Sequence, residues 1–181
     1  MTHKDQPNVV MEEDRGARVV VGIDYSTGAR AALMFALHDA ALRGVPVEAV
    51  VAYRPPDYWM DFNAVSTYQP EKARSAALEH GRAFVDRALP DGPQPPPEVR
   101  VRAAMGNAAD VLIHESHGAA LLVVGSRGHG GFASMMLGSV SMQCTLHASC
   151  PVTVVHSPEA RRERLHRRRD RHEDRRHAPV G

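Results

Sequence analysis

Short continuous runs of apolar residues alternate along the chain with longer stretches in which apolar residues recur at helical spacing. A continuous apolar run indicates a strand that is buried on both faces, and the helical spacing indicates a helix with one buried face. The predicted strands are Arg18–Ile23, Val47–Tyr53, Glu98–Met105, Ala119–Gly125 and Val152–His156. Because predicted helices separate them, we expect an α/β fold with one parallel sheet and helices on both faces.

Residues that cap helices mark the ends of the predicted helices. Ser26 and Thr27 are N-cap candidates for the first helix, and Gly44 suits the left-handed position that follows its last residue. The other helices are expected to begin at Pro70, at Asn107 and at Leu137, and to extend to Ala88, His117 and Ala148.

The length of 181 residues fits one domain with a tail at each end. We predict a polar tail over 1–17, a folded domain over 18–157 and an Arg-rich tail over 158–181. From Ser157 to Gly181 there are nine arginines, five acidic residues and few apolar residues. This composition is typical of a disordered segment or a solvated charged helix, so we do not expect it to bind nucleic acid.

The sequence also favours a compartment. Residues 1–17 lack the apolar core of a signal peptide, and no apolar run reaches the length of a membrane-spanning helix. The two cysteines, Cys144 and Cys150, are too few for a disulfide framework and suit a reducing environment. We therefore expect a cytoplasmic protein without a membrane partner, with Cys144 in the core of the last helix.

Two polar features lie where predicted strands end. Asp24 follows the first strand, and a glycine-rich segment that includes Gly125, Gly128 and Gly138 follows the fourth. In open parallel sheets, ligands bind at the carboxyl ends of the strands. Ser139 opens a helix there, and the free N–H groups and the dipole of a helix N-terminus favour phosphate. Further hydrogen bonds could come from Arg127, His129, Ser139 and Ser141, so we predict a site for the triphosphate of a nucleotide.

The spacing Gly125-x2-Gly128-x9-Gly138-Ser139 is similar to the phosphate-binding signature of the ATP-binding branch of the universal stress protein family. The segments VVVGIDYSTGARAALMFAL and HASCPVTVV also resemble that family. The resemblance covers roughly Arg18 to Ser157.

The resemblance implies a Rossmann-like, doubly wound, five-stranded parallel sheet of order 3-2-1-4-5. It implies ATP as the ligand, with the adenine near Ile23, Asp24 and Ala52. It places the ribose and phosphates against Gly125, Arg127, Gly128, Gly138, Ser139, Val140 and Ser141. It also implies a homodimer through the edge strand Val152–Val155. Members of the family act in stress survival by sensing or sequestering ATP, and some hydrolyse it slowly.

Several alternatives remain open from the sequence. Asp24 could cap the first helix as well as contact ligand, and Mg²⁺ could bridge the phosphates. The loop Arg54–Gln69 carries aromatic residues that could cover the adenine, bind a partner or anchor the loop, namely Tyr58, Trp59, Phe62 and Tyr68.

The leading hypothesis is an ATP-binding regulator that signals to an unknown protein partner. No Walker loop or nucleophile elbow is present in the sequence, so an enzyme that hydrolyses ATP slowly is the second hypothesis. The third is an interaction scaffold that binds no nucleotide. It arises because Tyr25 stands where the family often has glycine, and the tyrosine side chain could block the pocket.

Overall fold

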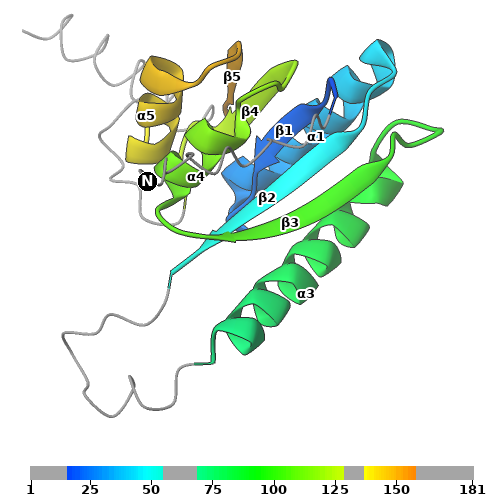
Figure 1. Ribbon diagram of the computed structural model, residues 1–181. Helices are drawn as coiled ribbons and strands as arrows, with labels where there is room; N and C mark the ends of the chain where they lie inside the picture. Colours follow the sequence, from blue (N-terminus) through cyan, green and yellow to red (C-terminus); the bar gives the residue numbers. More distant parts are fainter. Residues whose placement is uncertain (1–15, 55–68, 129–136, 158–181) are drawn as a thin grey trace, which may run out of the picture.

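The computed structural model describes residues 16–54, 69–128 and 137–157. Its centre is one sheet of five parallel strands in the order β3-β2-β1-β4-β5 (Figure 1). The strands are β1 (Val19–Gly22), β2 (Val47–Tyr53), β3 (Val99–Met105), β4 (Leu121–Gly125) and β5 (Val152–Val155). The predicted parallel sheet is therefore confirmed, and so is the strand order that the resemblance implies.

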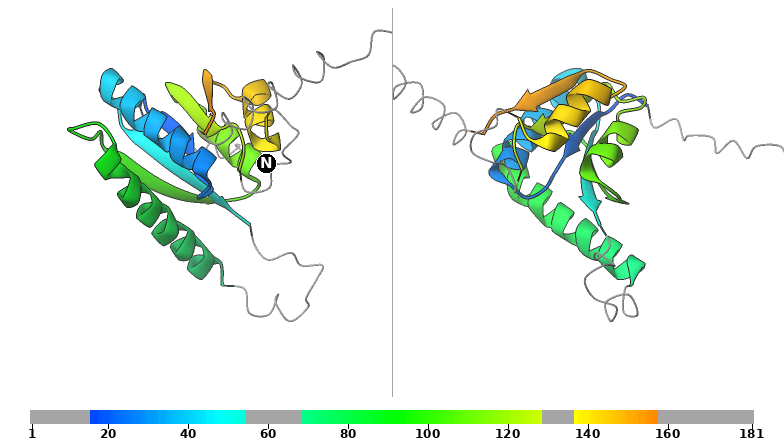
Figure 2. Two further views of the ribbon diagram at one scale, coloured as in Figure 1. Left: turned by 180° about the vertical axis from the view of Figure 1, so that it is seen from behind. Right: turned by 90° about the vertical axis from the view of Figure 1, so that its left-hand side faces the viewer.

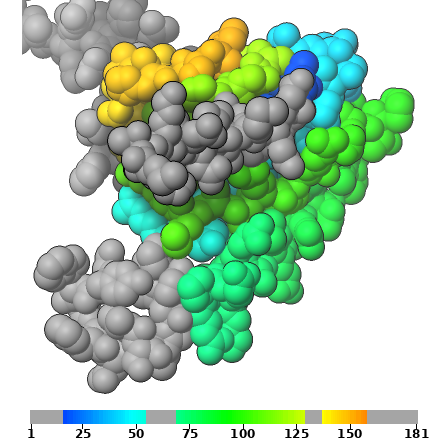
Figure 3. All heavy atoms as spheres, viewed as in Figure 1, coloured from blue at the N-terminus to red at the C-terminus, as the bar shows by residue number. Residues whose placement is uncertain are grey.

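Within the described residues, two helices cover each face of this sheet (Figures 1 and 2). On one face lie α1 (Thr27–Arg43) and α3 (Pro70–Ala88), and on the other lie α4 (Ala108–Glu115) and α5 (Ser139–His147). A short 3₁₀ turn, Leu89–Asp91, follows α3. The space-filling view places α5 and β5 at one end of the molecule and α3 at the opposite end (Figure 3).

The core is divided between the two faces because side chains alternate along each strand. Val19 and Val21 of β1 belong to the cluster under α1 and α3, whereas Val20 belongs to the cluster under α4 and α5. The buried face of α1 consists mostly of alanine, which lets the helix axis approach the sheet closely. The sheet is thus buried on both faces in its middle, as the continuous apolar runs predict.

The helix ends follow local sequence, with small differences from the predictions. The Ser26 hydroxyl accepts a hydrogen bond from the N–H of Ala29 at 3.0 Å, and Gly44 ends α1 with φ 68°. The helix that was expected from Leu137 begins at Ser139, because Gly138 is extended (φ −73°, ψ 164°) and acts as the N-cap. The helix that was expected through His117 ends at Glu115.

A buried ion pair lies at the amino end of the sheet. The Arg18 Nε atom, just before β1, is 2.5 Å from Glu48 Oε2 on β2, and both side chains are almost fully buried. The same guanidinium donates to the carbonyl oxygens of Glu115 at 3.0 Å and His117 at 3.4 Å. Arg18 therefore ties two strands to the end of α4.

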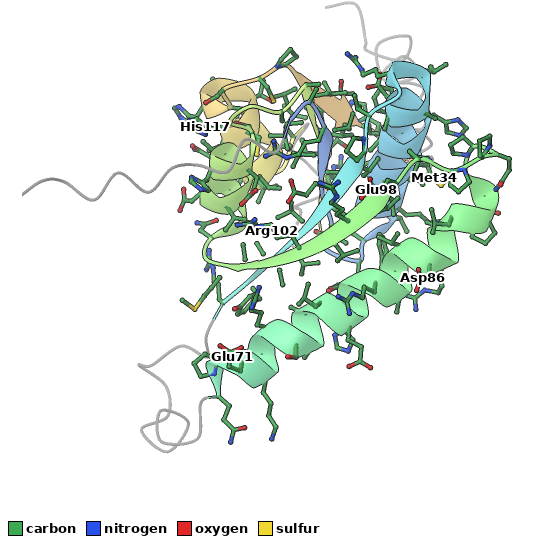
Figure 4. All side chains as sticks on the ribbon, turned by 45° about the vertical axis from the view of Figure 1, so that its right-hand side comes forward. Met34, Glu71, Asp86, Glu98, Arg102 and His117 are labelled. Atoms are coloured by element: carbon green, nitrogen blue, oxygen red, sulfur yellow. The ribbon has the colours of Figure 1, made fainter. Side chains whose placement is uncertain are left out.

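A second ion pair reaches the same helix from the edge of the sheet. Arg102 Nε on β3 lies 3.2 Å from Glu115 Oε1 at the end of α4 (Figure 4). The same view marks both ends of α3, with Glu71 in its first turn and Asp86 towards its end. The ion pairs of Arg18 and Arg102 thus both lie near the end of α4, away from the carboxyl ends of the strands.

Candidate functional site

The carboxyl ends of β1 and β4 lie side by side in the sheet, since the two strands pair in parallel. The chain leaves β1 for β2 on one side of this pair, and β4 leads to β5 on the other. The direction of winding therefore reverses between β1 and β4, which is the place where open α/β sheets bind ligands. Asp24 and the start of the glycine-rich segment both follow these strand ends, as the sequence predicts.

Asp24 bridges the start of α1 and the glycine-rich segment. Its Oδ1 atom accepts from the Ser26 N–H at 3.1 Å and from the Ser26 hydroxyl at 2.5 Å. Its Oδ2 atom lies so close to Gly128 that a Cβ at that position would overlap it. The N-cap of α1 is Ser26, so Asp24 supports the cap rather than acting as one.

Close backbone packing explains why glycine is needed at Gly125 and at Gly28. A Cβ added to Gly125 would lie 2.8 Å from the carbonyl carbon and 2.9 Å from the carbonyl oxygen of Gly28. A Cβ on Gly28 would in turn overlap the carbonyl oxygen of Arg127. Sequence reasoning missed Gly28, although a glycine in the first turn of a helix is costly and could have signalled a close contact.

Hydrogen bonds join the two ends of the glycine-rich segment. The Gly138 N–H donates to the carbonyl oxygen of Ser126 at 2.8 Å, and the Ser126 N–H donates to that of Val155 at 2.7 Å. The Ser141 hydroxyl is buried and donates towards the carbonyl oxygens of Gly138, at 2.9 Å, and Ser126, at 3.3 Å. Ser141 therefore supports this closure from behind, and its predicted contact with nucleotide stays a prediction.

The N-terminus of α5 presents free donors at this edge. The first backbone bond of the helix runs from the Met142 N–H to the Gly138 carbonyl oxygen, at 3.0 Å. Among the described residues, the N–H groups of Ser139, Val140 and Ser141 have no acceptor. Among the described residues, a Cβ at Gly138 would come no closer to another atom than the Ser126 oxygen at 3.6 Å, so an alanine would fit there without overlap. Free N–H groups and the helix dipole together favour an anion here.

At the carboxyl end of β2, on the other side of β1 from the glycine-rich segment, the backbone offers one hydrogen-bond donor and one acceptor. β1 pairs with β2 only as far as Val50, while β2 continues to Tyr53. The Val50 carbonyl oxygen accepts from Ile23 on the β1 side, at 3.0 Å, and that of Tyr53 accepts from Gly106 at the end of β3, at 2.9 Å. Since alternate residues of a parallel strand face alternate neighbours, the N–H and C=O of Ala52 face the space beyond the end of β1.

Ile23 and Arg127 take different positions at this edge. The Ile23 side chain is buried in the cluster under α1 and α3, so only its backbone faces the site. Arg127 is half-buried and its carbonyl oxygen packs on Gly28. His129 and the aromatic residues Tyr58, Trp59, Phe62 and Tyr68 lie outside the described residues.

Tyr25 turns its ring towards α3. The ring packs edge to face against Phe84, with centroids 5.6 Å apart, and the hydroxyl donates to the Ala77 carbonyl oxygen at 3.5 Å. Partial burial raises the pKa of the phenol. Its φ of 65° explains why a glycine also suits this position. The ring lies on the side of β2 and β3, whereas the glycine-rich segment follows β4.

The remaining chemistry of the described chain is sparse. Cys144 is fully buried between α5 and the sheet, as predicted, and burial raises the pKa of its thiol to about 11. No group of three or more His, Cys, Asp or Glu residues that could hold a metal ion occurs within residues 16–54, 69–128 and 137–157. Over these same stretches, no helix combines the length and hydropathy that crossing a membrane requires.

A doubly wound parallel sheet with a carboxylate, a glycine-rich segment and an open helix N-terminus at its switch point defines a class of α/β proteins built to hold a ligand at that edge. Within this class, the sequence model of the universal stress protein family matches residues 17–156. The chain belongs to the universal stress protein family.

Curated relatives agree with this assignment. Universal stress protein Rv2623 of Mycobacterium tuberculosis is 33% identical over 148 residues, which cover 78% of this chain and 48% of the relative. A universal stress protein of Mycolicibacterium smegmatis is 34% identical over 154 residues, with 81% and 50% covered. The chain thus spans about half the length of the curated relatives that it matches.

Solved structures show the same fold. A universal stress protein in complex with cAMP is 25% identical and superposes with a TM-score of 0.54, covering 78% of this chain and 97% of that one. Universal stress protein UspA from Lactobacillus plantarum superposes with a TM-score of 0.57 at 20% identity, with 78% and 98% covered. The second likeness concerns the fold alone.

Proposed function

We propose that this protein binds an adenine nucleotide, ATP in particular, at the carboxyl edge of β1, β2 and β4. The observation that carries the proposal is the N-terminus of α5, where three N–H groups have no acceptor among the described residues. These donors would hold the phosphates, and Gly128 and Arg127 would approach them from the other side of the segment. The phosphates could carry Mg²⁺ with them, since that ion is commonly bound through substrate phosphates.

The base would bind at the other end of the same edge. The N–H and C=O of Ala52 provide one donor and one acceptor, which matches the acceptor N1 and the amino donor N6 of adenine. The Asp24 carboxylate lies between the two ends and is placed to accept from ribose hydroxyls. The solved relative that binds cAMP supports an adenine nucleotide as the ligand class.

Calorimetry with ATP, with and without Mg²⁺, tests the proposal. The decisive variant is Gly138→Ala, because its methyl group would stand at the N-terminus of α5 without overlapping any described protein atom, the nearest being the Ser126 oxygen at 3.6 Å. We expect it to weaken ATP binding by at least about tenfold, or about 1.4 kcal/mol. Ser75→Ala, at an exposed position of α3, is the matched control and should bind like the unmodified protein. Absence of binding by the unmodified protein would refute the proposed function.

We also propose that the protein is a regulator whose nucleotide-bound form is read by a protein partner, and that it forms a homodimer through β5. The backbone of Pro151 and Val155 bonds towards β4, so that of Val152 and Val154 faces outward at the edge of the sheet. Apolar side chains of α5 are exposed, Met142 by 46% and Leu146 by 65%.

Proline substitution tests the dimer. Val154→Pro removes only an outward N–H group and is expected to give a folded monomer in light scattering, since proline is tolerated at a sheet edge. Thr153→Pro, which removes an N–H that faces β4, should instead destabilise the fold. A Val154→Pro protein that remains dimeric would exclude strand pairing at β5.

A further inference from the structure

Tyr25 adopts a backbone conformation that its side chain disfavours. Its φ of 65° lies in the left-handed region, which large residues rarely adopt. Strain of this kind persists only where surrounding contacts hold it, and it occurs preferentially at ligand sites. Here the strained residue directly follows Asp24, the carboxylate that lies against Gly128.

The contacts that hold Tyr25 come from α3. Its ring packs edge to face on Phe84 at a centroid distance of 5.6 Å and on His80 at 6.3 Å, with interplanar angles of 80° and 89°. Its hydroxyl donates to the carbonyl oxygen of Ala77. Phe84 is itself buried under α3, so the ring rests on a fixed surface. These contacts offset the strain of the left-handed turn.

We propose that Tyr25 is a positioning residue for the nucleotide site. Its ring, anchored on α3, holds the left-handed turn, and this turn directs the Asp24 carboxylate to Gly128. Ser26, on the far side of the turn, donates twice to Oδ1 of the same carboxylate. The direction of Oδ2 is therefore set by the backbone of the residue between them. This inference rests on the proposed function, because the carboxylate matters only if a nucleotide binds beside it.

The arrangement connects the nucleotide site to α3. Asp24 and α3 share no element of secondary structure, and Tyr25, the residue after Asp24, contacts α3 through its ring and its hydroxyl. A shift of α3 against the sheet would change the turn and so the position of the carboxylate. Nucleotide affinity is therefore expected to depend on how α3 packs.

Three substitutions at Tyr25 separate the contribution of its ring from that of its backbone conformation. Tyr25→Ala keeps the strained turn but loses the ring, and it should weaken ATP–Mg²⁺ binding by roughly 5- to 30-fold, the range that corresponds to the cost of a left-handed residue. Tyr25→Gly also loses the ring but adopts the left-handed turn without strain. Its ATP affinity should therefore fall less than that of Tyr25→Ala, and its fold should be more stable than that of Tyr25→Ala. Tyr25→Phe keeps the ring on α3 but loses the hydrogen bond to Ala77, so its loss of ATP affinity should be smaller than that of Tyr25→Ala.

A double-mutant cycle with Asp24→Ala distinguishes positioning from a purely structural role. If Tyr25 acts through the carboxylate, Tyr25→Ala should change ATP affinity by less than about twofold in the Asp24→Ala protein, while still lowering Tm. Equal affinity losses in both backgrounds would overturn the inference and leave the proposed function intact. If Tyr25→Ala does not fold, Tyr25→Gly completes the same cycle. Absence of ATP binding by the unmodified protein would refute both proposals.

Discussion

Two alanine substitutions within the glycine-rich segment are expected to differ clearly in their effect on stability. At Gly125 a methyl group would lie 2.8 and 2.9 Å from backbone atoms of Gly28 and 3.2 Å from the N atom of Ala29. Backbone atoms cannot rotate away, so the overpacking should cost about 1–3 kcal/mol. Alanine regains about 0.5–1 kcal/mol of chain entropy relative to glycine within a strand. Taken at the middle of both ranges, Gly125→Ala should therefore lower the free energy of unfolding by roughly 1 kcal/mol.

At Gly138 the same change meets no overlap and an ordinary φ of −73°. Gly138→Ala gains about 0.4–1 kcal/mol through the unfolded state but loses a similar amount because alanine is a poorer N-cap than glycine. The free energy of unfolding should therefore stay nearly unchanged, while nucleotide binding is expected to weaken. Urea unfolding of both variants, without nucleotide, measures the difference. The reasoning fails if Gly125→Ala is as stable as the unmodified protein, or if Gly138→Ala is clearly less stable than it.

Three further predictions concern groups outside the site. Glu48→Leu leaves the buried Arg18 guanidinium without its carboxylate and should cost about 3–5 kcal/mol in urea unfolding, most of which should return when Arg18→Leu is added. Because burial raises the pKa of Cys144 from 9.0 to about 11, the neutral thiol stabilises the fold fully below pH 9. Stability should then fall as the pH approaches 11, and Cys144→Ala should make that fall smaller in urea titrations, since burial also raises the pKa of Tyr25 and of Cys150. Ser116→Ala removes the acceptor of the Ser149 N–H, at 2.8 Å, and should lower stability by about 1–3 kcal/mol, measured in the same way.

The sequence predicts most of this fold because its signals are local. Ser26 and Gly44 end α1 through contacts within a few residues of themselves, so a pattern read along the chain finds both ends. The start of α5 was placed too early, because Leu137 continues the apolar pattern while the extended Gly138 interrupts the helix. Helix boundaries of this kind depend on one backbone conformation, which composition does not reveal.

The candidate site could be predicted only in part, because several of its contacts join segments that lie far apart in the sequence. Asp24 and the glycine spacing are visible in the sequence, and the structure brings Asp24 and Gly128 together. The role of Gly28 depends on the carbonyl of Arg127, which lies about 100 residues away along the chain. The direction of the Tyr25 ring depends on Phe84 of α3 in the same way. Contacts between distant segments leave no local pattern to read.

The placement of Arg18 and Asp24 has a consequence for how such a protein can diverge. The two residues flank the same short strand, with the buried ion pair before it and the carboxylate of the proposed nucleotide site after it. Mutations that alter recognition at one end leave the anchoring at the other end intact, so the chain can explore new ligands without first losing its fold. Related proteins with this strand can therefore change their ligand more readily than their fold.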